Sequence, residues 1–389
     1  MRTRPFADVS AQREDFMSLK TILFATTFLA AAAPAALADV SVCISLSATG
    51  PTSALGTPQQ NSVKLLPTEA AGKTVRYTVF DDASDPGAAT QNARKCVNEQ
   101  AADVLIGGSG TPVAAAIGET QTPFLTLSPF VPQGKQSDWT FVVPQPVSLM
   151  AGAIAEDIAK RGFKTVGLIG FNDAYGDLWI KAIGPMLTDK GITLEPVERF
   201  ARTDTSVSSQ VLRLSAANPE AILVVSSGAP SAGPNLALAE RGYQGQIYHT
   251  HGSANGAFLK IAGDAADGTI LPVGPIMVGE LLPDGNPSRP IVIDYIARYE
   301  AEHGPGSVSP FGAYFYDAAL LVLAAAEKVP ATAEPGSPEF RSALRDALKR
   351  VEVPGLHGML RNDGRQQMSN GPENWIMSVV DNGTWAIRD

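Results

Sequence analysis

The stretch that decides the fold is Ile106-Gly-Gly-Ser-Gly-Thr-Pro-Val113, which follows the apolar run Asp103-Val-Leu-Ile106. An apolar run of this kind is typical of a buried strand. Pro112 suits the first turn of a helix, where a missing N–H costs nothing, and the glycines allow a tight turn and a close approach to a ligand. The stretch predicts strand, turn and helix, either as an ordinary structural connection or as a place where helix N–H groups meet an anion.

The composition is that of a globular protein too large for one ordinary core. The chain has 389 residues, of which 44% are hydrophobic and 18% charged, and these values suit two domains. The formal net charge is −9 with scattered Lys and Arg, which argues against a nucleic-acid partner. After the N-terminal region no apolar run is long enough to span a bilayer.

The N-terminus has the pattern of a signal peptide. Met17-Ser-Leu-Lys20 is a short basic start, Thr21–Ala33 an apolar stretch and Ala36-Leu-Ala38 an A-x-A cleavage site. If Met17 is the true start, the residues before it are an upstream extension. We therefore expect residues 1–38 to be removed on export to a bacterial periplasm.

Strand and helix patterns alternate along the remainder of the chain and start afresh after about residue 143. Such alternation predicts an α/β fold with two doubly wound parallel sheets that carry helices on both faces. In these sheets ligands lie beyond the carboxyl ends of the strands. The loops expected at those ends are 48–56, 107–112, 128–132, 171–176, 200–206, 226–230 and 251–255.

Proline marks the expected helix starts. Thr57-Pro58 and Asp85-Pro86 each predict an N-cap followed by the first helical residue. A β-hairpin is expected at the end of the chain around Asp381-Asn-Gly383. Later helices that begin with proline are expected at Pro290–Glu302, Pro310–Lys328 and Pro338–Arg350.

The two cysteines, Cys43 and Cys96, are both expected to be buried. Cys43 lies in the first strand pattern, and Cys96 lies on the apolar stripe of a helix. An oxidising compartment permits a disulfide, but two cysteines carry no spacing that indicates a disulfide framework. We therefore expect two core thiols.

An ordered set of short motifs resembles a known family. The motifs are Gly50-Pro51, Asp81-Asp-Ala-Ser-Asp-Pro86, Ile106-Gly107, Tyr175-Gly176 and Ala313-Tyr-Phe-Tyr-Asp-Ala318. Together they resemble the type I periplasmic solute-binding proteins of ABC importers, the leucine/isoleucine/valine-binding group, over essentially the whole mature chain. The resemblance implies two lobes that close on a small carboxylate with neither a cofactor nor a metal. It also implies a monomer that docks on the permease subunits.

The resemblance further implies three crossovers between the lobes. We expect them near Val142–Gln145, Leu271–Pro275 and Gly358–Pro372. Lobe 1 would then consist of residues 39–143 plus 275–360, and lobe 2 of residues 144–274 plus 361–389.

Site positions carry over from the family one at a time. Thr111, with Ser109 and Gly110 beside it, fits the loop that holds the ligand carboxylate. Tyr175 fits the tyrosine of the second lobe that covers the ligand. The loop after the fourth strand adds Phe130 and Val131. The remaining candidates lie in second-lobe loops and are Arg202, Ser227, Thr250 and His251.

Two residues depart from the family's pattern. Pro132 stands where the group usually has a threonine, and His251 stands where an acidic residue pairs with the ligand ammonium. A neutral imidazole supplies no such charge. The run Tyr248-His-Thr-His-Gly252 looks more like the branch that binds aromatic acids and aromatic 2-oxo acids, such as phenylpyruvate. His251 or Thr250 would then donate to a ligand oxygen, unless His251 is a satisfied structural histidine.

Several of these residues allow a second interpretation. Arg202 either pairs with a ligand carboxylate or bonds to Asp204. His249 lies two positions before His251, so the pair suggests a metal site. No Cys or further His lies nearby in the sequence to complete a ligand set. Phe311 is a further candidate, and Trp179 is expected to pack in the core.

Other functions also remain open. The chain could bind branched-chain or other aliphatic amino acids or amides, or act as a ligand-sensing domain. An enzyme is disfavoured, because the sequence contains no G-x-S-x-G, H-E-x-x-H or phosphate-loop lysine motif.

Overall fold

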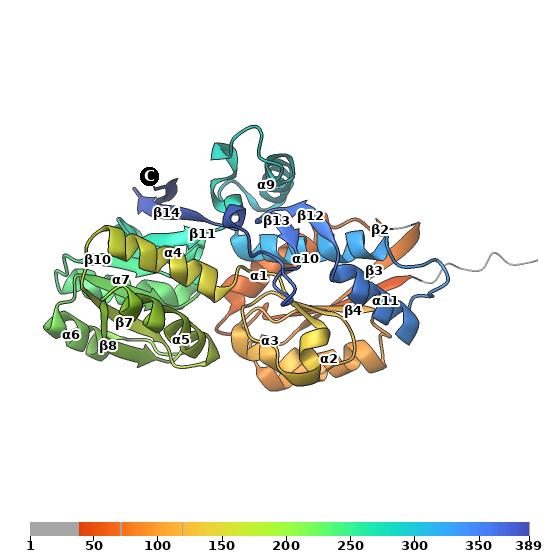
Figure 1. Cartoon of the computed structure of the whole chain (residues 1–389), viewed down its shortest axis with the longest axis horizontal. Helices are drawn as coiled ribbons and strands as arrows, with labels where there is room; N and C mark the ends of the chain where they lie inside the picture. Colours follow the sequence, from red (N-terminus) through yellow and green to blue (C-terminus); the bar gives the residue numbers. More distant parts are fainter. Residues whose placement is uncertain (1–38, 71, 119, 389) are drawn as a thin grey trace, which may run out of the picture. The chain divides into compact units, whose positions relative to one another are not determined.

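The structure, a computed structural model, describes residues 39–70, 72–118 and 120–388, so the expected signal peptide lies outside the described residues. Within this part, no helix combines the length and the apolar character that crossing a membrane requires. The elements gather around two large sheets (Figure 1). The predicted α/β class with two parallel-dominated sheets is confirmed.

The first sheet has six strands, and all its pairings are parallel except the short β2–β3 pair. In spatial order they are β2 (Glu69–Ala70), β3 (Lys73–Asp81), β1 (Val40–Leu46), β4 (Val104–Gly107), β5 (Phe124–Thr126) and β6 (Thr140–Val142). Its helices come from distant parts of the sequence, so that α10 packs on α1 (Figure 1). They are α1 (Ser53–Ser62), α2 (Pro86–Asn98), α3 (Thr111–Ile117), α10 (Pro310–Ala326) and α11 (Pro338–Leu348).

The alternation along β1 explains why helices cover both faces of this sheet. Successive side chains of a strand point to opposite faces. Val42 and Ile44 belong to the cluster that α10 and α11 help to form, whereas Cys43 belongs to the cluster built with α2 and α3. Both sets of β1 side chains are almost fully buried.

The expectation of two core thiols is wrong, because Cys43 and Cys96 form a disulfide. The bridge joins β1 to α2, with 5.7 Å between the two Cα atoms. Both residues are buried, as expected. A pairing across 53 positions depends on how α2 docks on the sheet, and residue spacing does not reveal that docking.

The second sheet has seven strands. β7 (Thr165–Phe171), β8 (Thr193–Phe200), β9 (Ala221–Val225), β10 (Gln246–His249) and β11 (Ile270–Val273) are parallel. β14 (Ile376–Asp381) runs antiparallel to β11 and forms the expected hairpin with β15 (Thr384–Ile387). The helices around this sheet are α4 (Val147–Lys160), α5 (Ala174–Asp189), α6 (Ser208–Ala217), α7 (Ala232–Glu240) and α8 (Gly256–Ala262).

The chain passes between the two sheets three times. It leaves the first sheet after β6 and enters α4, and it leaves the second sheet after β11 towards α9 (Arg289–His303) and α10. It returns to the second sheet through the small antiparallel pair β12 (Glu352–Gly355) and β13 (Gly358–Arg361), which precedes β14. These connections lie beside the site described below.

One of the two predicted helix starts is confirmed and the other is wrong. Asp85 caps α2 as predicted, since its side chain accepts a hydrogen bond of 2.7 Å from the N–H of Ala88. The predicted start at Thr57 is wrong, because α1 begins at Ser53 and contains Pro58. A turn closed by the Ser53 N–H and the Gly50 carbonyl begins this helix earlier.

Candidate functional site

A narrow cavity lies at the carboxyl ends of strands from both sheets. Its open volume is only about 20 Å³, far below the roughly 300–1,000 Å³ of ligand pockets, so a ligand enters only if the surrounding loops move apart. Its walls include the loops that follow seven parallel strands, β4 to β10, together with side chains from α1 and α10. The lining residues are Leu55, Ser109, Gly110, Thr111, Leu127, Ser128, Pro129, Pro144, Tyr175, Arg202, Ser227, His251, Gly252, Phe311 and Tyr314.

Most of the site residues expected from the sequence meet on this cavity, and three do not. Those on it are Ser109, Gly110, Thr111, Tyr175, Arg202, Ser227 and His251. Phe130 packs beneath its own loop, and Val131 is 62% exposed. Both line a separate surface groove beside α5. Thr250 is fully buried and acts behind the cavity wall rather than on it.

The hydroxyl groups of the loop after β4 bond to other parts of the protein. The Oγ of Ser109 accepts from the Ser47 N–H at 2.9 Å and donates to Oε1 of Gln59 at 2.6 Å. The Oγ1 of Thr111 donates to the Pro129 carbonyl at 2.8 Å and lies 2.9 Å from Oγ of Ser128. These hydroxyls therefore fix the cavity wall. α3 has only seven residues, so its dipole adds little attraction for an anion.

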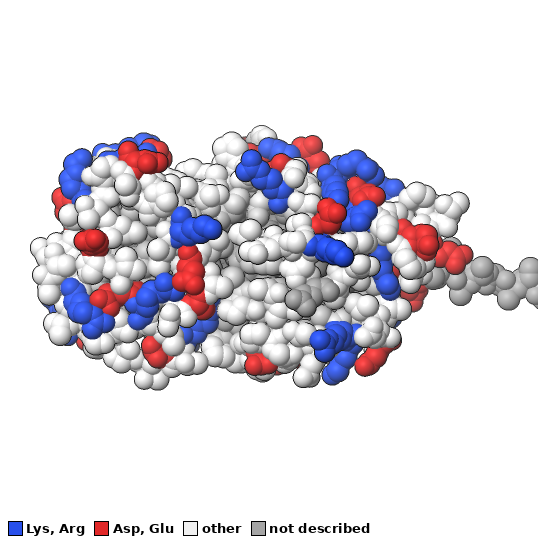
Figure 2. Space-filling model, turned by 60° about the horizontal axis from the view of Figure 1, so that its bottom comes forward, with Lys and Arg blue, Asp and Glu red and all other residues white. Residues whose placement is uncertain are grey.

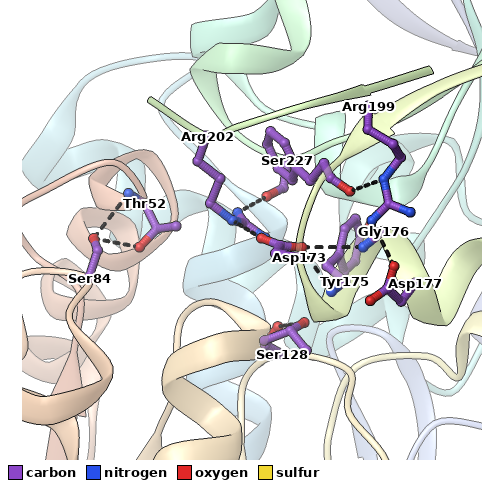
Figure 3. A network of polar contacts seen from close by, with 12 residues as sticks. Thr52, Ser84, Ser128, Asp173, Tyr175, Gly176, Asp177, Arg199, Arg202 and Ser227 are labelled. Carbon is purple, nitrogen blue, oxygen red and sulfur yellow. Dashed lines mark hydrogen bonds and ion pairs between the residues drawn. The ribbon is translucent and has the colours of Figure 1, made fainter. Parts of the chain in front are cut away.

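Arg202 brings a positive charge to the cavity (Figure 3). Its Nε donates to Oδ2 of Asp173 at 2.6 Å and its Nη1 to Oγ of Ser227 at 3.0 Å. The guanidinium also lies over the Phe171 ring, 4.1 Å from the centroid. The alternative pairing with Asp204 does not occur, because that carboxylate accepts from the Ala201 N–H. Arg202 is thus held in one orientation before any ligand arrives.

Tyr175 extends from the first turn of α5, which Asp173 caps through the N–H groups of Tyr175 and Gly176 (Figure 3). Its hydroxyl donates to Oγ1 of Thr250 at 2.9 Å. Burial raises the pKa of Tyr175 to about 12, so the hydroxyl stays protonated. A side chain on Gly252 would place its Cβ 2.9 Å from this hydroxyl, so the contact requires glycine there.

His251 is a buried, neutral imidazole at the cavity. Burial, and then the nearby His357, lower its pKa to about 4. Its Nδ1 has no hydrogen-bond partner among the residues that the structure describes. His251 is therefore not a fully satisfied structural histidine, because this ring nitrogen is buried without a partner.

His249 has a structural role instead. Its ring nitrogens bond to Ser253 at 2.8 Å and to Asn235 at 2.6 Å, which leaves no nitrogen for a metal ion. Burial lowers the pKa of His249 to about 3. Trp179, which is fully buried, packs between the Tyr175 and His251 rings, as a core residue does.

Three aromatic or apolar residues of the lining were not expected, or not singled out, from the sequence. Tyr314 is not among the residues expected from the sequence, and Phe311 is one of the further candidates; both line the cavity from α10. Leu55 reaches it from α1. The motif Ala313-Tyr-Phe-Tyr-Asp-Ala318 contains Tyr314, but nothing in its spacing indicates which ring faces a ligand.

The charges of the cavity lining indicate which ligands it suits. Among the described residues that line the cavity, Arg202 is the single ionised side chain, and none is Asp or Glu. Elsewhere, charges of both signs are interspersed over the face shown in Figure 2. The cavity therefore offers aromatic rings and the guanidinium of Arg202, which pairs with Asp173 outside the lining, and the lining provides no carboxylate to balance an ammonium group.

Comparison with known proteins gives the family. Residues 39–384 match the family described as periplasmic binding protein. The chain belongs to this family. A comparison with curated protein sequences gave no match.

Solved structures show the same fold in other periplasmic and extracellular binding proteins. An extracellular ligand-binding receptor from Rhodopseudomonas palustris HaA2 is 38% identical, with a TM-score of 0.88 over 90% of this chain and 100% of that chain. The leucine-binding protein LivK from Thermotoga maritima MSB8 is 19% identical, with a TM-score of 0.77 over 90% and 98% of the two chains. An ABC-transporter solute-binding protein from R. palustris in complex with benzoate is 18% identical, with a TM-score of 0.76 over 90% and 95%. The last two likenesses concern the fold alone.

Proposed function

We propose that this chain is the periplasmic solute-binding component of an ABC importer and that it captures a small carboxylate without an ammonium group. Aromatic acids and aromatic 2-oxo acids are the preferred ligands. The observation that carries the proposal is the lining of the cavity, which contains Arg202 but no Asp or Glu, while Asp173 pairs with Arg202 from outside the lining. An α-amino acid would leave its ammonium group without a counter-charge, which is costly in a buried site.

Each part of such a ligand has a partner on the cavity. Arg202 binds the carboxylate, because a guanidinium matches its geometry and its Nε and Nη1 are already held in place. The neutral His251 donates to a 2-oxo oxygen. Tyr175 and Phe311 contact the ring of the ligand. The benzoate complex of the R. palustris protein is consistent with this ligand class, although that protein shares only the fold.

Capture requires two lobes that move relative to each other. We propose that lobe 1 consists of residues 39–143 plus 275–360 and lobe 2 of residues 144–274 plus 361–389. The lobes separate to admit the ligand and close over it, with bending confined to the three connections between the sheets. The loaded form then docks on the permease subunits. The protein makes and breaks no covalent bond.

A matched pair of ligands tests the proposal. Phenylpyruvate and phenylalanine share the ring and the carboxylate and differ in a 2-oxo or 2-ammonium group. Phenylpyruvate should raise the melting temperature of the mature protein and give a saturable calorimetric titration, and chromatography should recover it unchanged. Stabilisation by phenylalanine or leucine instead would restore the amino-acid hypothesis, and product formation would overturn the binding function.

A further inference from the structure

Tyr314 is an aromatic residue of the cavity lining that is held by two other side chains. It lies on α10, is 3% exposed and lines the cavity. Its ring stacks on the imidazole of His357, with 3.9 Å between the centroids and 10° between the planes. Its hydroxyl donates to Oε1 of Gln145. Burial raises the pKa of Tyr314 well above its usual range, so this donor is retained.

Asp317 fixes the imidazole behind Tyr314. One carboxylate oxygen of Asp317 accepts from Nδ1 of His357 at 2.9 Å and from the His357 backbone N–H at 3.1 Å. The other accepts from the N–H of Leu356 at 2.6 Å. Asp317 and His357 are both fully buried. The orientation of the His357 ring, and therefore the plane against which Tyr314 stacks, is determined by several hydrogen bonds.

The same cluster touches all three connections between the sheets. Gln145 follows β6, and its Nε2 donates to the carbonyl of Asn374 at 2.7 Å. The Nδ2 of Asn374 donates to the carbonyl of His357 at 2.5 Å. Gly274 follows β11, and a Cβ there would lie 2.1 Å from Cδ2 of His357, so the connection requires glycine to pass the ring. The three connections therefore meet around one stacked Tyr–His pair.

We propose that Tyr314 is the residue that gives the cavity its preference for a planar ring, and that His357 and Asp317 are positioning residues for it. The inference rests on the proposed carboxylate-binding function and adds the origin of its ring specificity. A side chain already fixed in one rotamer loses little conformational entropy when a ligand packs on it. A fixed aromatic face favours an aromatic ring over a saturated ring of the same size.

Benzoate and cyclohexanecarboxylate measure this preference, because they share charge and ring size and differ in aromaticity. Aromatic pairs gain about 0.5–1.5 kcal/mol beyond area burial, so calorimetry on the wild-type protein should give a roughly two- to tenfold preference for benzoate. In Tyr314→Leu the ratio should fall below the wild-type value, and any preference that remains comes from Tyr175 and Phe311. His357→Asn keeps a donor for Asp317 but removes the stacked ring, so it should lower the ratio while Tyr314 remains.

Tyr316 provides the matched control on the same helix. It is also buried, and it contacts Tyr295 and Arg298 rather than the cavity. Tyr316→Leu should lower the melting temperature and leave the benzoate preference unchanged. If Tyr314→Leu does not fold, Tyr314→Phe replaces it in the test. The phenylalanine ring lacks the hydrogen bond to Gln145 and is less fixed, so the preference for benzoate over cyclohexanecarboxylate should decrease.

The outcomes separate the two claims. Wild-type protein that binds both acids, with an unchanged ratio in the Tyr314 and His357 variants, would overturn the inference and leave the carboxylate-binding function intact. Wild-type protein that binds neither acid, nor phenylpyruvate, would overturn both. A ratio that falls in the variants and holds in Tyr316→Leu supports the inference.

Discussion

Arg202 and Asp173 form an ion pair at the cavity wall, with 2.6 Å between Nε and Oδ2. Their side chains are only 14% and 19% exposed, so solvent screens the pair less than a surface salt bridge. The same carboxylate caps α5, the helix that carries Tyr175. One acidic side chain thereby sets the position of two proposed ligand contacts.

Replacing Arg202 should remove the group that binds the ligand carboxylate. Hydrogen bonds to charged groups contribute about 1.5–3 kcal/mol, so Arg202→Gln should weaken benzoate binding roughly ten- to hundredfold. Arg199→Gln is the matched control, because Arg199 pairs with Asp177 nearby but does not line the cavity (Figure 3). Titration calorimetry decides. Equal affinities of Arg202→Gln and the wild-type protein would place the carboxylate elsewhere.

Substitutions of Tyr175 should separate its ring from its hydroxyl. Tyr175→Phe loses one neutral hydrogen bond to Thr250 and should cost about 1 kcal/mol of unfolding free energy with little effect on ligand affinity. Tyr175→Ala also loses the ring and should weaken binding of an aromatic acid at least tenfold. Urea unfolding and calorimetry on both variants test this. A larger affinity loss in Tyr175→Phe than in Tyr175→Ala would contradict the assignment.

His251 should make the ligand-free protein sensitive to acid. Its folded pKa of about 4 lies below the ordinary value of 6.5, so the unfolded chain binds more protons between these values and stability falls as the pH falls. At pH 4.5 the loss attributable to His251 is about 2–3 kcal/mol. His251→Gln should reduce the slope of the unfolding free energy between pH 6.5 and 4.5 by about half, because His249 keeps its own contribution. His303→Gln, away from the cavity, serves as control, and an unchanged slope in His251→Gln would refute the prediction.

The disulfide should stabilise the fold without affecting the site. Closing a loop of this length stabilises a protein by about 2–4 kcal/mol. Replacing Cys43 and Cys96 together by alanine should lower the unfolding free energy by about that amount, and ligand affinity should stay the same because neither residue lines the cavity. Thiol titration of the denatured wild-type protein provides a direct check. Two free thiols per chain would contradict the bridge.

Local chemistry predicted much of the fold. The helix start at Asp85-Pro86, the first strand with Cys43 and the hairpin around Asp381-Asn-Gly383 depend on neighbours in the sequence, and each was predicted correctly. Tertiary contacts decided the failures. α1 starts four residues before Thr57, and the disulfide depends on how α2 docks.

The candidate site was predicted as a set of loops better than as a set of side chains. The rule that ligands lie beyond the carboxyl ends of parallel strands located the loops around Ser109, Tyr175 and His251. This rule does not predict whether a given side chain of such a loop faces the cavity. Phe130 packs into the core, and Tyr314 enters from a helix rather than from a strand end.

The buried bridge also has a practical consequence. The chain contains two cysteines and both are in the disulfide, so the native protein has no thiol that reacts with a maleimide. A cysteine introduced at the exposed Val131 would be labelled alone. That position shares its groove with Leu178 of α5, a helix beside the second sheet, so a fluorophore there would respond to the lobe movement proposed above. The molecule could thus be converted into an optical sensor for its own ligand.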